Sequence, residues 1–147
     1  MVGILIITHG KMAEGIVDSA NMIMGKNEQF DSLGLFPGTD LDQFKADIKK
    51  KFLELDIGDG VIIFVDLFGA SPYNMTSLNV GELLSENKKI RVVTGVNLPM
   101  VIEALNMRNI EDNIDFLYKS CLETGKEGIK ELLEEMASWG PDEENED

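Results

Sequence analysis

The single histidine of the chain, His9, stands at the end of a short apolar run and is followed by a glycine. The run, residues 2–8, is continuous and rich in isoleucine, which is typical of a buried strand. A neutral imidazole, with an unperturbed pKa of about 6.5, is a good nucleophile near neutral pH. It can accept a phosphoryl group and later release it. A lone histidine is more often an ordinary surface or core residue, but its place at a strand end makes His9 a candidate nucleophile.

Asp66 is the second candidate, because it directly follows the five apolar residues of another strand, 61–65. A carboxylate left unpaired in a dry place is costly, so Asp66 needs a partner. One such partner is the Nδ1–H of His9. That hydrogen bond would leave Nε2 with a free lone pair and would stabilise the imidazolium that forms. The alternative is that Asp66 caps a turn or binds loop amides.

The small residues after Asp66 form a third element that could hold an anion. Gly69 and Ala70 let backbone N–H groups approach a ligand, and the following helix adds amides and a favourable dipole. The hydroxyl of Ser71 could donate to a phosphoryl oxygen. Ser71 could equally be a helix N-cap, with Pro72 at the first helical position. The two interpretations are compatible, since the cap and the helix amides share one place.

Four further residues are candidates for the rim of this site. Gly10 follows the histidine, and Pro37 lies in a turn at the end of another strand. Phe68 is either an exposed apolar contact for a partner protein or a side chain packed over its own loop. Asn97 either lines the site or starts a helix.

The elements that must position these residues alternate between strand and helix, which predicts a parallel sheet covered by helices on both faces, with right-handed crossovers. In such α/β sheets, sites form beyond the carboxyl ends of the strands, where the strand order reverses. All the candidates above follow a predicted strand.

The expected strands are residues 2–8, 29–35, 61–65 and 90–93. The expected helices are residues 12–24, 41–55, one from Pro72, 99–106, and most of the chain from 115. Asp40 and Gln43 are expected to form a capping box at the start of the helix 41–55.

The length of 147 residues predicts one domain, over residues 1–138. Residues 139–147 are expected to be an acidic, disordered tail, because five acids and no base follow residue 139. Cys121 is the only cysteine, so it forms no internal disulfide or metal cluster and is interpreted as a small core residue.

The net charge of −14 argues against a partner that is nucleic acid or a membrane surface, because both bind basic proteins. Strong acidity favours a basic protein partner or serves solubility. No apolar run approaches the roughly 20 residues that span a bilayer. The amino terminus lacks the basic region of a signal peptide, so a cytoplasmic protein is expected.

Several other phosphate-related or metal-dependent functions fit the residues poorly. One histidine does not supply the converging ligands of a zinc hydrolase, and no Walker-type phosphate loop occurs. A flavodoxin-like flavin site should have hydroxyl-rich residues in the first loop, unlike 8–12 here. A response-regulator receiver also ends its third strand with an aspartate, but should carry acidic residues where this chain has Thr8 and His9.

The same residues resemble the EIIA component of the mannose family of the phosphoenolpyruvate-dependent sugar phosphotransferase system (PTS). The resemblance runs from about residue 2 to about residue 132, and the combination and order of its strings are specific. The matching strings are residues 6–10, 65–74, 95–100 and 123–128.

The resemblance implies a phosphocarrier that serves sugar uptake. His9 would accept a phosphoryl group from phospho-HPr by in-line displacement and pass it to an EIIB component. Asp66 would orient the histidine, and Ser71 would lie at the phosphoryl site. The resemblance implies no metal and no organic cofactor, and contact with the membrane only through the sugar permease components. Since the chain stops after an acidic tail, EIIB is expected to be a separate protein.

The resemblance also implies a four-stranded sheet with the order 2-1-3-4 and a homodimer. In that dimer a C-terminal segment, near residues 126–132, would add an antiparallel strand to the sheet of the partner. The periodicity of the same segment predicts a helix, and local pattern cannot decide between the two.

Two rival functions remain open at this stage. The phosphotransferase subunit of a dihydroxyacetone kinase system shares the fold and the early histidine, although residues 66–74 look more like the mannose type. A non-catalytic regulatory α/β module is the other.

Overall fold

The computed structural model describes residues 1–139 and confirms the expected alternation of strands and helices. The predicted acidic tail, apart from Trp139, lies outside the described residues. The elements are β1 (Gly3–His9), α1 (Met12–Met24), β2 (Phe30–Leu35), α2 (Leu41–Leu55), β3 (Val61–Val65), α3 (Ser71–Ser85), β4 (Ile90–Val93), α4 (Leu98–Met107), α5 (Ile114–Glu127) and α6 (Leu132–Ser138).

The sheet has the order β2-β1-β3-β4, and every neighbouring pair is parallel, as predicted. The register pairs His9 with Leu35 of β2 and Ile7 with Val65 of β3. The carboxyl ends of these three strands therefore lie at one edge. Strand β2 lies on one side of β1 and strand β3 lies on its other side. The strand order therefore reverses between β1 and β3, and a site is expected beyond the carboxyl ends of these two strands.

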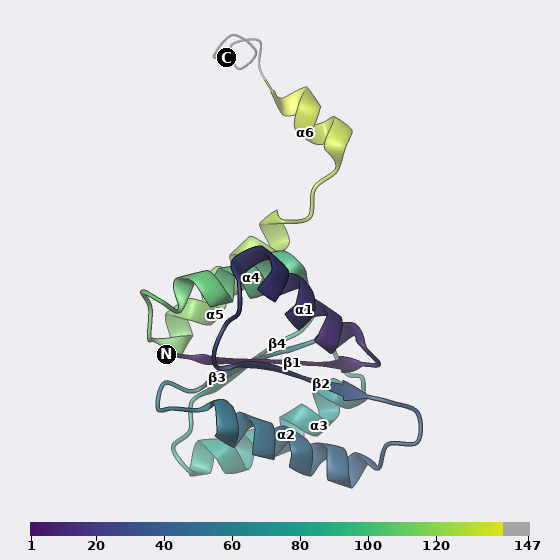
Figure 1. Cartoon of the computed structure of the whole chain (residues 1–147), viewed down its shortest axis with the longest axis vertical. Coiled ribbons are helices and arrows are strands. Elements are labelled where there is room, and N and C mark those ends of the chain that lie inside the picture. The colour runs from purple at the N-terminus through teal and green to yellow at the C-terminus, as the bar shows by residue number, and fades with distance from the viewer. Residues whose placement is uncertain (140–147) are drawn as a thin grey trace.

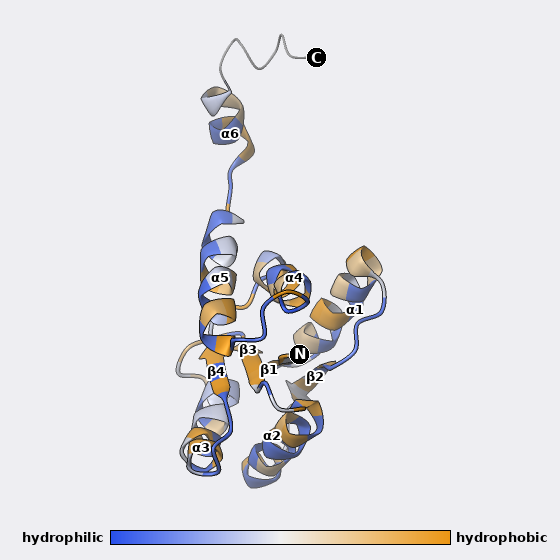
Figure 2. Ribbon diagram, turned by 90° about the vertical axis from the view of Figure 1, so that its left-hand side faces the viewer, coloured by the Kyte–Doolittle hydropathy of each residue, from blue (hydrophilic) through white to orange (hydrophobic). Residues whose placement is uncertain are grey.

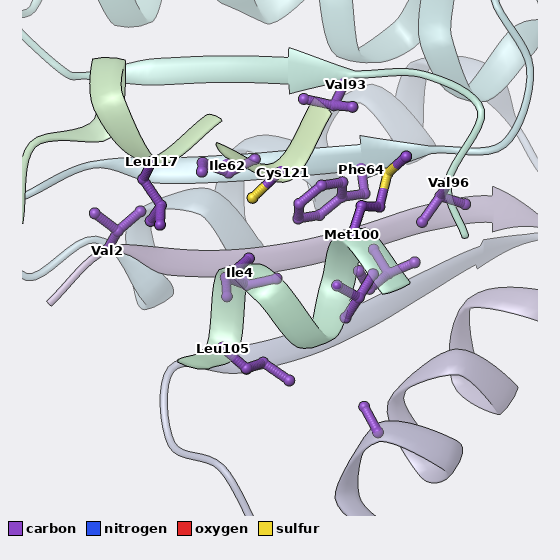
Figure 3. Close-up of a cluster of buried hydrophobic side chains, with 14 of the residues drawn as sticks. Val2, Ile4, Ile62, Phe64, Val93, Val96, Met100, Leu105, Leu117 and Cys121 are labelled. Atoms are coloured by element: carbon purple, nitrogen blue, oxygen red, sulfur yellow. The ribbon is translucent and has the colours of Figure 1, made fainter. Parts of the chain in front are cut away.

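Helices cover both faces of the sheet, with α1, α4 and α5 on one face and α2 and α3 on the other (Figure 1). Alternate side chains of a strand point to opposite faces, so Ile4 and Ile6 join the core under the first group while Leu5 and Ile7 join the core under the second. Figure 3 shows the first core, in which Phe64 of β3 lies among side chains of α4 and α5. Because both faces are buried, β1 and β3 are apolar at nearly every position.

The helix starts agree with the sequence only in part. Asp40 caps α2, and its carboxylate accepts from the amides of Asp42 and Gln43 at 2.9 and 3.4 Å. The predicted capping box is wrong: within residues 1–139 the side chain of Gln43 accepts no hydrogen bond from Asp40 N, and its Nε2 donates to Asp47 Oδ1 at 2.9 Å. The prediction of Ser71 as an N-cap is wrong by one residue: Ala70 is the N-cap of α3 and Ser71 is its first residue.

The segment after α5 differs from the helix that periodicity predicts for residues 126–132, whereas the antiparallel strand on the sheet of a partner stays a prediction. Helix α5 ends at Glu127, residues 128–131 form no regular element within the described chain, and α6 begins at Leu132. The helix predicted for residues 126–132 is therefore wrong at residues 128–131. Figures 1 and 2 show α6 standing away from the sheet and its covering helices. No helix among residues 1–139 has the length and apolar character needed to cross a membrane.

Candidate active site

The His9–Asp66 pair predicted from the sequence lies where the strand order reverses, at the carboxyl ends of β1 and β3. The Oδ2 atom of Asp66 lies 2.6 Å from His9 Nδ1. The same oxygen accepts a hydrogen bond from the backbone N–H of His9 at 2.9 Å. The other oxygen, Oδ1, accepts from the Leu67 N–H at 2.9 Å. The carboxylate thus holds both the ring and the backbone of His9.

This geometry determines which ring nitrogen of His9 is available for reaction. An ionised carboxylate only accepts hydrogen bonds, so Nδ1 must carry the proton in the contact with Asp66. In the neutral ring Nε2 then has its lone pair free. The side chain of His9 is 48% exposed whereas that of Asp66 is 10% exposed, so the ring can be reached while the carboxylate behind it is shielded.

The environment of Asp66 keeps its carboxylate ionised. Burial by itself raises the pKa of Asp66, but the backbone N–H of His9, the His9 ring and the Leu67 N–H together outweigh burial. The net result is a pKa below the ordinary value for aspartate. The negative charge therefore persists at neutral pH, ready to balance a positive charge on the imidazole.

The loop that leads into α3 has the small residues that an anion site needs. Gly69 has a φ of +80°, a conformation that L side chains rarely adopt, and its carbonyl accepts from the Asn74 amide at 3.0 Å. Ala70, the N-cap, makes no side-chain cap. Ser71 is half-buried in the first turn of α3, and its hydroxyl has no hydrogen bond within residues 1–139.

Two predicted rim residues, Pro37 and Phe68, lie exposed beyond the strand ends. Pro37 follows Phe36 in a turn closed by a hydrogen bond from Thr39 N to Phe36 O at 3.1 Å. The ring of Phe68 is 76% exposed, although it contacts Tyr73 with ring centroids 4.8 Å apart. The ring of Phe68 therefore packs against a side chain of α3 and stays largely exposed, and its contact with a partner protein stays a prediction.

Asn97 has a structural role that the sequence offered as one of two alternatives. Its Oδ1 accepts from Met100 N at 3.1 Å and caps α4. Its Nδ2 donates to the carbonyl of Gly125 in α5 at 2.9 Å. The amide thus ties the loop after β4 to the end of α5, and its place on the rim of the site stays a prediction. Gly10, with a φ of +56°, forms the turn after His9.

Sequence reasoning missed Thr8, which makes two hydrogen bonds beside the nucleophile. Its hydroxyl accepts from Ala13 N at 2.8 Å and donates to the carbonyl of His9 at 3.0 Å. The sequence carried a signal for it, because the hydroxyl of a threonine at the end of an otherwise apolar strand needs a hydrogen-bond partner.

Cys121 is buried as expected, and burial raises the pKa of its thiol to about 12. Within residues 1–139, no group of three His, Cys or acidic side chains could hold a metal ion.

The sequence of this chain is similar to sequences of known proteins. Residues 3–122 match the EIIA-man family model, described as the PTS system fructose IIA component. The mannose-specific EIIAB component of the PTS of Escherichia coli K12 is 32% identical over 131 residues, which cover 89% of this chain and 39% of that protein. The chain therefore spans about two fifths of the length of that relative. The fructose-specific EIIA component of Bacillus subtilis is 25% identical over 108 residues, covering 74% of this chain and 71% of that protein.

A solved structure shows the same architecture. The EIIA component of the phosphotransferase system from Streptococcus agalactiae superposes with a TM-score of 0.81 and 27% sequence identity. The match covers 90% of this chain and 98% of that one.

Proposed function

The chain belongs to the EIIA-man family of PTS components, and from that premise we propose that it is a phosphocarrier for sugar uptake. His9 accepts a phosphoryl group from phospho-HPr and passes it to an EIIB component. The observation that carries the proposal is the contact of 2.6 Å between Asp66 Oδ2 and His9 Nδ1, on a ring that is 48% exposed. In the neutral ring this contact leaves the Nε2 lone pair free, on a side chain that another protein can reach.

The proposed step conserves charge and protons in a simple way. The Nε2 lone pair of His9 attacks the phosphorus of phospho-HPr in line, a bond from Nε2 to phosphorus forms, and the phosphorus–nitrogen bond of the donor breaks. The donor imidazole leaves with the electron pair of that bond. The proton on His9 Nδ1 stays in place, so the ring becomes a cation, and the Asp66 carboxylate stabilises that charge. In the transfer to EIIB, a nucleophile of EIIB attacks the same phosphorus in line, the bond from Nε2 to phosphorus breaks, and its electron pair returns to Nε2.

The phosphoryl oxygens have candidate donors on the facing loop. Helix α3 begins at Ser71, a few residues after Asp66. The free amides at the amino terminus of a helix favour an anion. We assign Ser71 to the phosphoryl site on this ground, with Gly69 and Ala70 giving close access to the backbone. Catalysis of this kind depends on positioning and charge stabilisation rather than on a metal or organic cofactor.

The surroundings of His9 suit a protein partner. Four apolar side chains beyond the ends of β1, β2 and β3 are exposed: Met12 by 47%, Phe36 by 46%, Leu67 by 60% and Phe68 by 76%. An exposed apolar group of this kind marks an interaction surface. The net charge of −14 favours a basic partner over nucleic acid. The proposal places the protein in the cytoplasm, with the membrane reached only through the sugar permease components.

The proposal includes a homodimer held by the segment after α5. Ile129, Leu132, Leu133, Met136 and Trp139 are all exposed, between 47% and 77%, although they are large and apolar. Strand β4 pairs only with β3 among the described residues, which leaves one sheet edge open. In the dimer, the segment near residues 126–132 of a second copy would add an antiparallel strand at this edge and would bring the apolar side chains that follow it against the partner.

Reconstitution with phosphoenolpyruvate, enzyme I and HPr tests the phosphocarrier proposal. The chain should gain one acid-labile phosphate, and His9→Ala should gain none while its circular dichroism is unchanged. A His9→Ala protein that still accepts phosphate would refute the nucleophile, and a wild-type protein that accepts none would leave a regulatory module as the better interpretation. Adding candidate EIIB proteins or dihydroxyacetone kinase then identifies the acceptor.

Sedimentation of the full chain tests the homodimer. The wild type should sediment as a dimer, and replacement of both Leu132 and Leu133 by aspartate should give a monomer. Leu78→Asp is the matched control, because Leu78 is also exposed, by 57%, but lies on α3. A wild-type monomer at all concentrations contradicts this part of the proposal and leaves phosphate acceptance untouched.

A further inference from the structure

Thr8 is a buried polar residue that the proposed transfer does not use directly. It is the last residue of β1 before the nucleophile, and its exposure is 0%. A hydroxyl in such a place must satisfy its hydrogen-bonding capacity within the protein. Thr8 does so with the carbonyl of His9 and with an amide of the first turn of α1. This pattern distinguishes it from a threonine that only fills a core.

The first bond connects Thr8 to the start of α1. Ala13 is the second residue of this helix, so its N–H has no acceptor within the helix. Lys11, the N-cap, offers no side-chain bond. The hydroxyl oxygen of Thr8 accepts from Ala13 N at 2.8 Å and takes the place of a cap.

The second bond connects Thr8 to the nucleophile. Because the hydroxyl oxygen accepts from Ala13, its hydrogen is free to donate to the carbonyl of His9, at 3.0 Å. The N–H of the next residue, Gly10, donates to Leu35 O at 2.7 Å. Both sides of the peptide that follows His9 are therefore held, one by Thr8 and one by β2.

We propose that Thr8 is a positioning residue for His9, an inference that rests on the proposed phosphocarrier function. The backbone N–H and the Nδ1 of His9 must both reach one oxygen atom, Asp66 Oδ2, at 2.9 and 2.6 Å. This convergence needs a defined orientation of the His9 backbone. The Thr8 hydroxyl supplies it by fixing the carbonyl on the other side of the same residue, and so it maintains the ring tautomer with a bare Nε2.

A purely structural role for Thr8 predicts something different. As a cap alone, its hydroxyl would contribute to stability and leave the chemistry of the ring unchanged. Thr76 provides the matched comparison, because it is also buried at 0% and its hydroxyl donates to Pro72 O at 2.7 Å inside α3. Thr8→Val and Thr76→Val each replace a buried hydroxyl by a methyl group of the same size.

Phosphorylation kinetics separate the two roles. Thr8→Val should lower the maximal rate of phosphoryl acceptance about tenfold, with the half-saturating concentration of phospho-HPr unchanged, because the ring and not the docking surface is disturbed. Thr8→Ser keeps the hydroxyl and should stay within about threefold of the wild type. Thr76→Val should match the wild-type rate. Equal rates for the two valine variants, or a slow Thr8→Ser, would overturn the proposal.

Nitrogen-15 NMR of the His9 ring tests the proposal without any transfer step. The wild type and Thr8→Ser should show a single tautomer with the proton on Nδ1, whereas Thr8→Val should show a mixture. An unchanged tautomer in Thr8→Val contradicts the role of Thr8 even if the protein accepts phosphate. If Thr8→Val shows the mixture of tautomers but the wild type accepts no phosphate, Thr8 still orients the ring. In that case only the phosphocarrier function is refuted.

A measurement on the wild type alone covers the case in which Thr8→Val does not fold. The Thr8 hydroxyl proton should exchange slowly enough to be observed by NMR and should show a close contact to the Ala13 amide proton. A hydroxyl proton lost to rapid exchange would contradict the two hydrogen bonds and with them the proposal.

Discussion

The two edges of the sheet use their polar groups in opposite ways. At the edge where the strands begin, Arg108 is 3% exposed, and its guanidinium donates to the carbonyls of Val2, Glu28 and Gln29. At the edge where the strands end, the side chain of His9 is 48% exposed, and Nδ1 is the ring nitrogen that bonds to Asp66. The guanidinium of Arg108 is buried and connects segments of the chain, whereas the imidazole of His9 is exposed to solvent.

The comparison teaches where stability and reactivity reside in this fold. The buried guanidinium satisfies backbone carbonyls of β1 and of the loop before β2, which would otherwise be left without donors. The imidazole is oriented from behind by Asp66 and keeps an unused lone pair in front. Changes at the first edge should therefore alter the free energy of unfolding, and changes at the second should alter the rate of phosphoryl transfer.

Asp66→Asn should give the largest effect, and this effect should be on the rate of transfer. The amide would present a donor to Nδ1 and favour the opposite ring tautomer, so phosphoryl acceptance should slow by about 10²–10³-fold. Single-turnover phosphorylation by phospho-HPr measures the rate. Asp115→Asn is the control, because this aspartate pairs with exposed Arg91 far from His9. A rate equal to that of the control would remove Asp66 from the mechanism.

Arg108→Ala should produce the converse result. Loss of the guanidinium leaves buried carbonyls without donors and a cavity, so we expect a loss of about 3 kcal/mol in the free energy of unfolding. Urea denaturation measures it, and the folded protein should still accept phosphate at the wild-type rate. Arg91→Ala, at an arginine whose side chain is 44% exposed, should cost less than about 1 kcal/mol. Slower transfer by folded Arg108→Ala would show that the two edges are coupled.

Two glycines sharpen the comparison, since each lies in or beside the sheet at one edge and touches a backbone carbonyl. A Cβ on Gly34 would lie 2.4 Å from Gly10 O, and one on Gly3 would lie 2.7 Å from Leu55 O. Alanine at either position should cost about 1–3 kcal/mol in unfolding free energy. Only Gly34→Ala should also slow transfer, by about threefold to tenfold, because it displaces the turn after His9. Equal slowing by Gly3→Ala would mean that general loss of packing is enough.

The smallest effect should be the change in the free energy of unfolding with pH that comes from protonation of the Asp66 carboxylate. The pKa of this carboxyl is lowered from 3.8, despite burial, by hydrogen bonds from His9 and Leu67. The ionised form therefore stabilises the fold above pH 3.8, and this contribution is lost as the pH falls through the lower folded value. The difference in unfolding free energy between the wild type and Asp66→Asn should be present near pH 5 and should close below pH 3.8. A difference that stays constant down to about pH 2 would contradict the lowered pKa.

Local patterns predicted most of the fold because each element obeys a period that can be read in isolation. The apolar run 61–65 and the helical spacing over 12–24 match β3 and α1 to the residue. Predictions that depended on a side chain choosing between neighbours were less successful. Gln43 bonds to Asp47 instead of closing a capping box, and Ser71 lies one residue inside α3. In each case the side chain had more than one position or partner within reach, and the local pattern does not distinguish between them.

The segment after α5 illustrates a different limit. Its apolar spacing favours a helix, and the structure has one from Leu132, but residues 128–131 interrupt it. Side chains such as Leu133 and Trp139 are exposed in a single chain. The conformation of such a segment depends on what covers it, and periodicity carries no information about a surface contributed by another molecule.

By itself the sequence determined which groups could react, since one histidine and one aspartate each end an apolar run where α/β sheets form their sites. Only the tertiary structure decided that Asp66 faces Nδ1, that Nε2 is bare, and that Thr8 holds the carbonyl of His9. The reason is physical: the register of β1 against β3 brings together two residues that lie 57 apart along the chain, and a local pattern does not contain that register.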